Sequence, residues 1–268
     1  MMKITSDLHV HTALSSCAKP EATVAFYMDK AREIGLKTLG FTDHLWDSAI
    51  PKANGFYRPQ DFAHILQIKE ELEKADKTGI DRILFGAEGE YDPYRHGVAL
   101  TPAVAEQLEV LLVPNSHTHM MMPKDYYDPP RRHAEFMIEA FYDIINSEIA
   151  PYITAIPHPF AAVACAKYYS SRVPVATITD DEFKACFAAA AEKGIAMEIN
   201  PNFFRNQTKE QIDADQFTRM FRIARDMGCL FTVGLDSHST GGYAAFDVIY
   251  NAIDVLELNE NHLHPLAR

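Results

Sequence analysis

The chain has 268 residues, of which 47% are hydrophobic and 23% are charged, a composition typical of a globular protein with a sizeable core. Its formal net charge of −12 argues against non-specific binding to nucleic acid, because such binding requires a surplus of lysine and arginine. No stretch approaches the roughly 18 apolar residues that a membrane span needs, so we expect no membrane partner.

The four cysteines, Cys17, Cys165, Cys186 and Cys229, form no C-x-x-C pair and no tight framework. We interpret at least three of them as reduced thiols of a cytosolic protein. The first residues, MMKITSDLHV, lack the long apolar run of a signal peptide. We therefore expect a cytoplasmic protein.

In chain order, strand-like runs alternate with helix-like runs. The predicted strands cover 3–10, 37–42, 82–91, 108–115, 152–159, 195–200 and 229–238. The predicted helices cover 21–35, 59–75, 101–107, 131–148, 179–194, 208–228 and 243–258. Thr179 and Glu182 form a capping box at the start of one helix, which stops at Gly194, and Gly228 ends the next.

This alternation predicts an α/β fold with a parallel sheet covered by helices. We find no low-complexity segment or linker, so residues 1–268 are expected to form a single domain. Seven strand–helix units favour a TIM-like barrel over an open sheet, although periodicity alone does not prove closure.

Histidines and acidic residues gather just after the predicted strand ends. In SDLHVHT, His9 and His11 share one face of an extended segment, although an H-x-H pair alone could also be solvated. Later strand ends carry Asp43, His44, Glu88, Glu90, His117, His119, His158, Glu198, Asn200, Asp236 and His238. Barrels of this class build their active sites at this face. Mixed imidazoles and carboxylates suit Mn, Zn or Fe, and the number of candidates predicts two or three divalent ions.

The ordered motifs H-x-H, T-D-H, G-x-E, S-H, H-P and D-S-H resemble those of the PHP (polymerase and histidinol phosphatase) family. The resemblance runs from Asp7 to about Ser239 and implies a metal-dependent phosphoesterase on a distorted (β/α)7 barrel. GAEGEY and MEINPNFFR are most similar to the histidinol phosphatase branch.

The family pattern implies three metal positions. The first would use His9, His11, Glu88 and Asp236, and Glu88 would bridge to a second ion held by His117 and His158. The third would use His44, His238 and a further histidine, but this chain has Cys17 there. Cys17 could ligate zinc as a thiolate or could be a packed thiol that leaves the third position weak or empty.

Other residues near the strand ends are assigned supporting roles. We expect Asp43 to orient an imidazole, whereas Glu90 and His119 remain alternative ligands. Glu198 and Asn200 are expected to shape the pocket floor.

A bound phosphate also needs cationic partners. Arg205, in the loop after strand 195–200, is the first candidate because its guanidinium fork suits phosphate oxygens. Arg131 and Arg132 come next, and the alternative for them is a basic pair in the first turn of a helix.

These features predict a phosphomonoesterase that hydrolyses a small phosphate ester through a metal-activated hydroxide. Glu88, Asp236 and His238 are the predicted catalytic residues. The favoured substrate is histidinol phosphate, from histidine biosynthesis, and the protein could be a homo-oligomer.

Alternative functions remain open. A PHP hydrolase could act on nucleotides or oligonucleotide ends, although the negative charge favours nothing larger than a small nucleotide. A metal-dependent amidohydrolase would usually present a lysine where this chain has NSHTHM. A non-catalytic barrel would bind metal only structurally, yet structural sites are usually closed by four ligands.

Overall fold

The computed structural model describes residues 2–162 and 169–268. A parallel sheet forms its centre, in the order β1 (Ser6–Val10), β2 (Thr38–Phe41), β4 (Arg82–Gly89), β7 (Val110–Leu112), β8 (Ala155–Ile156), β9 (Ala196–Ile199) and β10 (Phe231–Val233). The short strand β3 (His44–Leu45) pairs with the second half of β4, whose first half pairs with β2. Because β3 continues the line of β2, the sheet has the seven strand positions that the sequence predicts.

The two outer strands of this order nearly close the sheet into a barrel. Val10 at the end of β1 forms a parallel bridge with Ser237, which follows β10. The Asp236 amide donates to the His9 carbonyl at 2.9 Å, and the His11 amide donates to the Ser237 carbonyl at 3.1 Å. The predicted TIM-like barrel is therefore confirmed.

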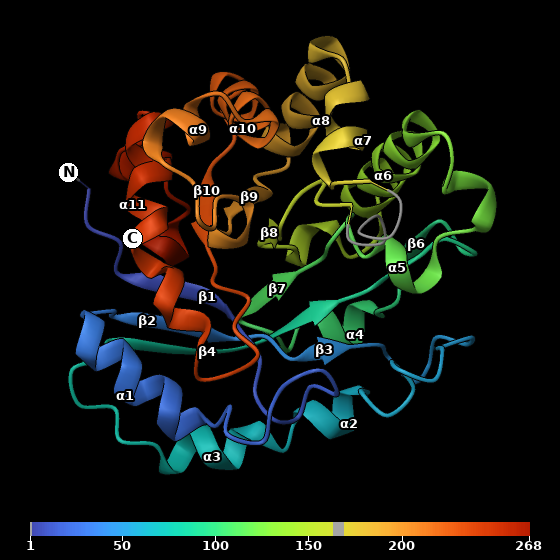
Figure 1. Cartoon of the computed structure of the whole chain (residues 1–268). Helices are drawn as coiled ribbons and strands as arrows, with labels where there is room; N and C mark the ends of the chain where they lie inside the picture. The colour runs from blue at the N-terminus through green and yellow to red at the C-terminus, as the bar shows by residue number, and fades with distance from the viewer. Residues whose placement is uncertain (1, 163–168) are drawn as a thin grey trace.

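Helices cover the outside of the sheet, as Figure 1 shows. They are α1 (Val24–Ile34), α2 (Phe62–Ile65), α3 (Ile68–Lys74), α4 (Pro102–Ala105), α5 (Thr118–Met121), α6 (Pro130–Ile145), α7 (Arg172–Thr177), α8 (Asp180–Glu192), α9 (Lys209–Asp213), α10 (Gln216–Asp226) and α11 (Phe246–Val255). A small hairpin of β5 (Tyr91–Asp92) and β6 (Gly97–Val98) lies apart from the main sheet. Among the described residues, no helix is both long enough and apolar enough to cross a bilayer.

The helix ends follow the local sequence. The predicted capping box of Thr179 and Glu182 opens α8, and Gly194 follows its end with a φ of 71°. The helix predicted over 208–228 is broken in two, because Asp215 adopts an extended backbone and caps α10 by accepting from the Phe217 amide. The helix predicted over 59–75 is also divided, into α2 and α3.

Close backbone packing inside the barrel depends on glycine at one position between β4 and β7. A Cβ atom on Gly86 would lie 2.2 Å from the Val110 carbonyl oxygen. The sheet therefore brings β4, which carries Glu88 near its carboxyl end, tightly against its neighbour.

Candidate metal centre

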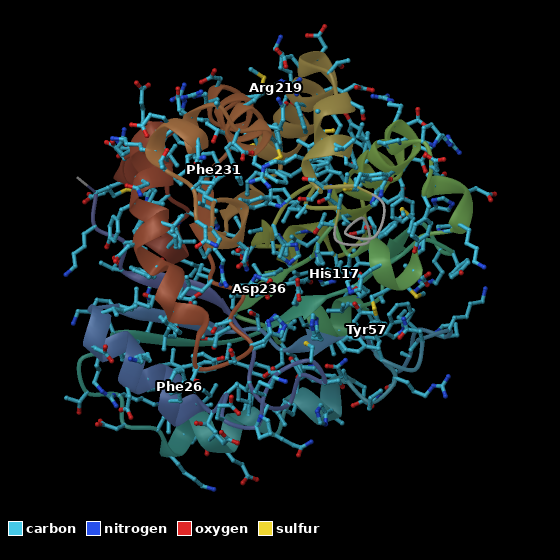
Figure 2. The ribbon with its side chains drawn as sticks, viewed as in Figure 1. Phe26, Tyr57, His117, Arg219, Phe231 and Asp236 are labelled. Atoms are coloured by element: carbon cyan, nitrogen blue, oxygen red, sulfur yellow. The ribbon has the colours of Figure 1, made fainter. Side chains whose placement is uncertain are left out.

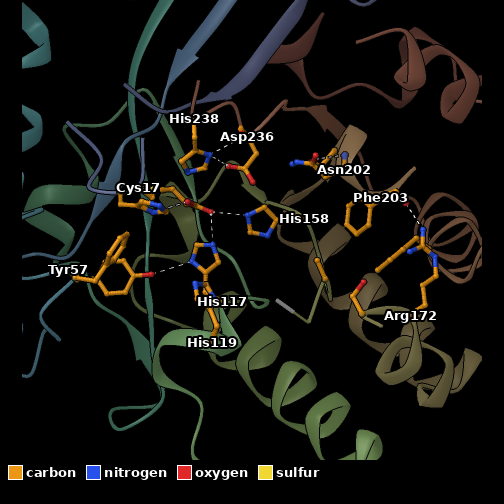
Figure 3. Close-up of a pocket in the computed structure, with 17 residues that line it drawn as sticks. Cys17, Tyr57, His117, His119, His158, Arg172, Asn202, Phe203, Asp236 and His238 are labelled. Atoms are coloured by element: carbon orange, nitrogen blue, oxygen red, sulfur yellow. Dashed lines mark hydrogen bonds and ion pairs between the residues drawn. The ribbon is translucent and has the colours of Figure 1, made fainter. Parts of the chain in front are cut away.

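The predicted ligands meet at one cavity at the carboxyl ends of the strands. The cavity has a volume of about 440 Å³, and Figure 3 shows the side chains that line it. The predicted ligands on its wall are Cys17, His44, Glu88, His117, His158, Asp236 and His238. His9 and His11, near the end of β1, are fully buried and reach the same acids. Figure 2 shows His117 and Asp236 near the middle of the fold, with Arg219 at its outer edge.

Glu88 is 1% exposed and lies at the centre of a ring of candidate ligand side chains, called the ring below. The other members of the ring are His9, His11, His44, His117, His158, Asp236 and His238. Its Oε1 lies 3.1 Å from His158 Nε2, 3.4 Å from His117 Nε2 and 3.7 Å from His9 Nε2. Its Oε2 lies 2.9 Å from His44 Nδ1 and 3.5 Å from His11 Nε2. The two oxygens of one carboxylate therefore face different sets of imidazoles, which is the arrangement expected of a bridging ligand.

Asp236 contacts two of the imidazoles that Glu88 contacts, those of His9 and His11. Its Oδ1 lies 3.4 Å from His11 Nε2, 3.6 Å from His9 Nε2 and 3.4 Å from His238 Nδ1. The residue has a φ of 50°, a left-handed conformation that is unusual for a non-glycine residue and is concentrated at functional sites. The His238 ring stacks on the His11 ring with a centroid distance of 4.2 Å.

Within the described residues, the possible ligand atoms fall into three overlapping groups, each with all of its atoms within 4.8 Å of one another. The groups are His9, Glu88 and His158; His9, His11 and Asp236; and His11, His44 and His238. His117 joins the ring through its contact with Glu88. This grouping supports a cluster of ions rather than a single isolated position.

The donor atoms fit divalent cations, because their present partners leave them poorly satisfied. His44 Nδ1 and Glu88 Oε2 are buried and form no hydrogen bond of acceptable geometry within the described part of the chain, although they lie 2.9 Å apart. A buried polar atom without a partner costs about 1–3 kcal/mol. A cation placed among these lone pairs would satisfy them, and imidazole with carboxylate suits Mn, Zn and Fe.

Both acids of the ring remain anionic. Burial raises the pKa of Glu88, but the imidazoles of His117, His9 and His44 outweigh it and hold that pKa well below its usual range. Burial likewise raises the pKa of Asp236, and the imidazoles of His9 and His11 bring it below the usual range. Burial lowers the pKa values of the His9, His44 and His117 imidazoles, but the nearby carboxylates outweigh it and raise these pKa values above the usual histidine range.

Four of the ligand imidazoles, those of His9, His11, His117 and His158, are oriented by a partner on the Nδ1 nitrogen. The pairs are His9 Nδ1 with Glu198 Oε2 at 2.7 Å, His11 Nδ1 with Ser15 Oγ at 3.1 Å, His117 Nδ1 with Glu90 Oε2 at 2.9 Å, and His158 Nδ1 with Ser116 Oγ at 2.6 Å. These contacts leave Nε2 of each ring facing the acids. Glu90 therefore orients the His117 imidazole. Glu198 orients the His9 imidazole instead of lining the cavity floor.

Asp43 and Asn200 act one step further out. Asp43 accepts from the Ser15 hydroxyl at 2.6 Å and from the Thr12 amide at 2.7 Å, so it orients His11 through Ser15. Asn200 lines the cavity, in agreement with the expectation that it shapes the pocket, and it also donates to Glu198 Oε1 at 3.1 Å. The prediction that Asp43 supports an imidazole agrees with these contacts.

Gly234 makes room for the pair of His9 and Glu198. A Cβ atom at this position would lie 2.2 Å from Glu198 Oε2 and 2.5 Å from His9 Cβ. The glycine just after β10 is therefore a requirement of the metal ring, which the sequence motifs did not indicate.

The remaining wall of the cavity contains residues that the sequence did not single out. They are Phe56, Tyr57, Ala161, Ser171, Arg172, Asn202, Phe203 and Phe217. Arg172 donates to Asp215 Oδ2 at 2.7 Å and to the Phe203 carbonyl at 2.6 Å, which fixes its guanidinium beside the aromatic rings. Asn202 and Phe203 directly follow the strand-end motif MEIN, so their position was a usable signal, whereas Arg172 follows no such motif.

His119 also lines the cavity but lies outside the ring of close contacts. Its ring centroid is 5.6 Å from that of His117. Burial and the neighbouring His117 lower the pKa of His119 to about 4, so it is a neutral imidazole on the cavity wall.

The three candidate arginines lie in different places. Arg205 is exposed and lines a neighbouring cavity of about 340 Å³, which shares Asn202, Asp236 and His238 with the main one. Arg131 and Arg132 begin α6 and line neither cavity within the described residues. Arg131 binds Glu182 through both terminal nitrogens, and Arg132 donates to Glu135 at 2.7 Å. These contacts favour the alternative of a basic pair in the first turn of a helix.

The cysteines differ sharply in environment. Cys186 and Cys229 are buried thiols, as expected for reduced structural cysteines, and Cys165 lies outside the described residues. Cys17 is exposed to the cavity. Burial raises the pKa of its thiol, but contacts with the imidazoles of His238 and His44 bring that pKa down to about 7.

A family model described as the PHP domain matches residues 7–202. The chain belongs to the PHP domain family. It is 25% identical over 266 residues to a probable phosphatase from Shewanella sp. (strain MR-4), covering 98% of this chain and 87% of that protein. It is 24% identical, with the same coverage, to a probable phosphatase from Shewanella oneidensis.

The fold is similar to that of a histidinol phosphate phosphatase from Lactococcus lactis subsp. lactis, solved with zinc, L-histidinol and phosphate. The TM-score is 0.69 at 16% sequence identity, and the match covers 97% of this chain and 95% of the other. At this identity the similarity establishes the barrel and its topology.

Proposed function

We propose that this protein is a metal-dependent phosphomonoesterase for a small phosphate ester, with histidinol phosphate as the first candidate substrate. The observation that carries the proposal is the position of Glu88, a buried anion with imidazoles around both oxygens at the mouth of the barrel. Membership of the PHP family and the names of the curated relatives support the same class of reaction.

Two or three divalent ions, Mn, Zn or Fe, would be held by the ring. Its proposed ligands are His9, His11, His44, Glu88, His117, His158, Asp236 and His238. Such ions supply an acidified water and offset the negative charge that develops on the phosphoryl oxygens. Glu88, Asp236 and His238 border the cavity and are the residues that we place next to the reacting phosphate.

Arg205 is the proposed partner for the phosphate on the side away from the ring. Arg205, Asp236 and His238 line the same neighbouring cavity. A guanidinium there can hold phosphoryl oxygens beside the metal ligands. Arg172, already held by Asp215 and the Phe203 carbonyl, keeps the neighbouring wall rigid.

The rest of the cavity suits a flat leaving group. Phe56, Phe203 and Phe217 offer ring faces and edges, and Asn202 offers an amide, so an aromatic alcohol can pack while its polar atoms are hydrogen-bonded. The imidazole of histidinol meets this description, and a volume of about 440 Å³ limits the ester to a small molecule.

The test combines metal analysis with phosphate release. The purified chain should contain divalent metal and release phosphate from histidinol phosphate faster than from a sugar phosphate or a nucleoside monophosphate. Activity should disappear on chelation and return with Mn, Zn or Fe. Full activity in metal-stripped protein would contradict the proposal, and preference for the nucleotide would move the substrate to the PHP nucleotide phosphoesterases.

A matched pair of variants tests the central acid. Glu88→Gln should lower both metal content and rate, because neighbouring ions lose a shared anionic ligand. Glu106→Gln, which changes an exposed glutamate outside the cavity, should change neither quantity. Equal metal content and equal rate in both variants would show that Glu88 is the wrong residue.

A further inference from the structure

Arg172 is a charged residue on the cavity wall that takes no part in the metal ring or in the proposed phosphate contacts. It begins α7, and its side chain is 36% exposed. Figure 3 shows Arg172 and Phe203 on the side of the cavity away from Tyr57 and Cys17. A leaving group whose phosphate lies at the ring can extend towards this wall.

The guanidinium of Arg172 is fixed in place by two acceptors. Its Nε donates to Asp215 Oδ2 at 2.7 Å, and its Nη2 donates to the Phe203 carbonyl at 2.6 Å. The Asp215 side chain is 3% exposed, and its carboxylate also accepts from the Phe217 amide at 2.9 Å and from Gln207 Nε2 at 2.8 Å. All of these contacts are made by the chain, so the guanidinium is positioned before a ligand binds.

Arg172 has donor groups beyond those that fix it. A guanidinium has five N–H groups, and within residues 2–162 and 169–268 no acceptor binds either N–H of Nη1. The guanidinium carbon lies 5.3 Å from the centroid of the Phe217 ring, and that ring lies 4.3 Å from the Phe203 ring. Both rings line the cavity. This wall therefore combines two aromatic rings with a fixed cation that can donate further hydrogen bonds.

We propose that Arg172 determines substrate specificity by donating from Nη1 to a hydrogen-bond acceptor at the far end of a flat leaving group. The proposal rests on the proposed phosphomonoesterase function and deepens it by naming the class of alcohol, an aromatic ring that bears an acceptor and packs on Phe203 and Phe217. A ring nitrogen and a carboxylate share this chemistry. The unprotonated imidazole of histidinol has such an acceptor, whereas a phenyl ring has none.

The physical consequence is a preference between rings of the same size and shape. A phenyl and a pyridyl ring pack equally well on the two phenylalanines, but only the pyridyl nitrogen can accept from Arg172. A hydrogen bond from a charged donor changes affinity by about tenfold or more. Because Asp215 already orders the guanidinium, little further side-chain entropy is lost when this bond forms.

Binding of non-hydrolysable phosphonates measures this preference without turnover. The ligands are benzylphosphonate, its three pyridylmethyl analogues and 3-carboxybenzylphosphonate, added to zinc-loaded full-length protein at pH 8, where the pyridine nitrogen is unprotonated. In calorimetric titrations, at least one pyridyl ligand should bind about tenfold or more tightly than benzylphosphonate. A preference for the carboxylate alone would support the proposal and identify the acceptor as an acid.

A double variant removes the donor without leaving a buried charge unpaired. Arg172→Met deletes the guanidinium, and Asp215→Asn in the same protein removes the charge that it neutralised. Asparagine is also a good helix cap, so it keeps an acceptor for the Phe217 amide. The preference between pyridyl and benzyl ligands should disappear in this protein, while benzylphosphonate should bind about as well as before.

Arg219 offers a matched control away from the cavity. It donates to Asp180 at 2.8 Å through Nε and to the Ile178 carbonyl at 2.8 Å through Nη2. Its guanidinium carbon lies 5.5 Å from the centroid of the Phe183 ring, and within the described residues Arg219 lines neither cavity. Arg219→Met with Asp180→Asn should therefore keep the preference of the parent protein.

The parent protein decides the outcome even if a variant fails to fold. Equal affinity for benzylphosphonate and all the acceptor-bearing ligands, or no binding of any of them, would overturn the proposal. A preference that survives in the folded Arg172 variant, as judged by thermal melts, would also overturn it. If the preference is present but no phosphate ester is hydrolysed, the proposed function fails and the assignment of Arg172 stands.

Discussion

Replacing Glu198 by glutamine tests whether the ring depends on the partners behind its imidazoles. Glu198 is fully buried, and its Oε2 accepts from His9 Nδ1 at 2.7 Å. Its Oε1 accepts from the His158 amide at 3.2 Å and from Asn200 Nδ2 at 3.1 Å. All of these contacts require an acceptor, which a carboxylate supplies on both oxygens and an amide supplies on one.

In Glu198→Gln the single amide oxygen should keep the two donors on the Oε1 side, so the new NH2 group faces His9 Nδ1. His9 must then accept at Nδ1 and carry its proton on Nε2, the atom that faces Glu88 and Asp236. His9 Nε2 then carries a proton and cannot bind a metal, and the His9 imidazole loses the basicity that a carboxylate partner gives it. Losses of this kind are about 10- to 100-fold in metal affinity, equivalent to about 1.4–2.8 kcal/mol.

Competition with a chromophoric chelator measures this loss, with thermal unfolding of metal-free protein as a check on the fold. Asp47→Asn is the matched control, because Asp47 is a buried carboxylate that accepts from Thr101 and the Ala49 amide and contacts no ligand imidazole among the described residues. Metal affinity within twofold of the parent in Glu198→Gln, with the control also unchanged, would refute the tautomer argument.

Four further predictions follow from the structure. Gly234→Ala should lower metal affinity and reduce stability by about 1–3 kcal/mol through overpacking, whereas Gly97→Ala, whose nearest neighbouring atom would be 3.9 Å away, should do neither in chelator competition and thermal melts. Arg205→Ala should lower kcat/KM by about ten- to hundredfold with metal content unchanged, and Arg205→Lys should recover part of the loss in steady-state assays. Arg131 lowers the pKa of Glu182 from 4.5 to about 2. This ion pair therefore stabilises the fold at pH values above the usual glutamate pKa, and its contribution is lost as the pH falls towards 2. Arg131→Gln should lower the free energy of unfolding by about 1 kcal/mol at pH 7 and by much less near pH 2, measured by denaturant melts. Chelation should lower Tm while the far-ultraviolet circular dichroism stays native, and a random-coil spectrum would contradict this.

The ligand ring was predictable because it depends on strand ends, and strand ends are local features. His9 and His11 alternate across an extended segment, and each later motif directly follows a buried apolar strand. Parallel strands present their carboxyl ends on one side, so residues far apart in the chain were expected to meet there. The structure brings them within 4 Å of Glu88 or Asp236.

The partners behind the ring were only partly predictable, because their roles depend on which way each side chain points in the closed barrel. Glu198 and Glu90 carry the same strand-end signal as the ligands, yet both lie behind imidazoles instead. The need for Gly234 arises from contacts across β9, β10 and β1, which no stretch of sequence contains.

The helix predicted over 208–228 was wrong in its extent, because a polar side chain within it makes contacts that end the helix. The periodicity of 208–228 predicts one helix, but Asp215 turns its carboxylate to the Phe217 amide and to Arg172 and so starts a new one. Because Arg172 lies in a segment without a strand-end motif, its partnership with Asp215 was not visible in the sequence. The break between α9 and α10 leaves the Asp215 carboxylate free to bind Arg172, which lines the cavity.

The hydrogen bonds behind the ligand imidazoles are made by the chain alone, without a bound ion. Ser15, Glu90, Ser116 and Glu198 hold the outer nitrogens of the ligand imidazoles through contacts made by the chain alone. These side chains are buried and belong to the same strand ends as the ligands, so folding of the sheet sets the ring orientation. Two of the five buried side-chain atoms that have no hydrogen-bond partner among the described residues, His44 Nδ1 and Glu88 Oε2, lie between these oriented imidazoles. A cation bound there would satisfy both atoms and would gain affinity from doing so.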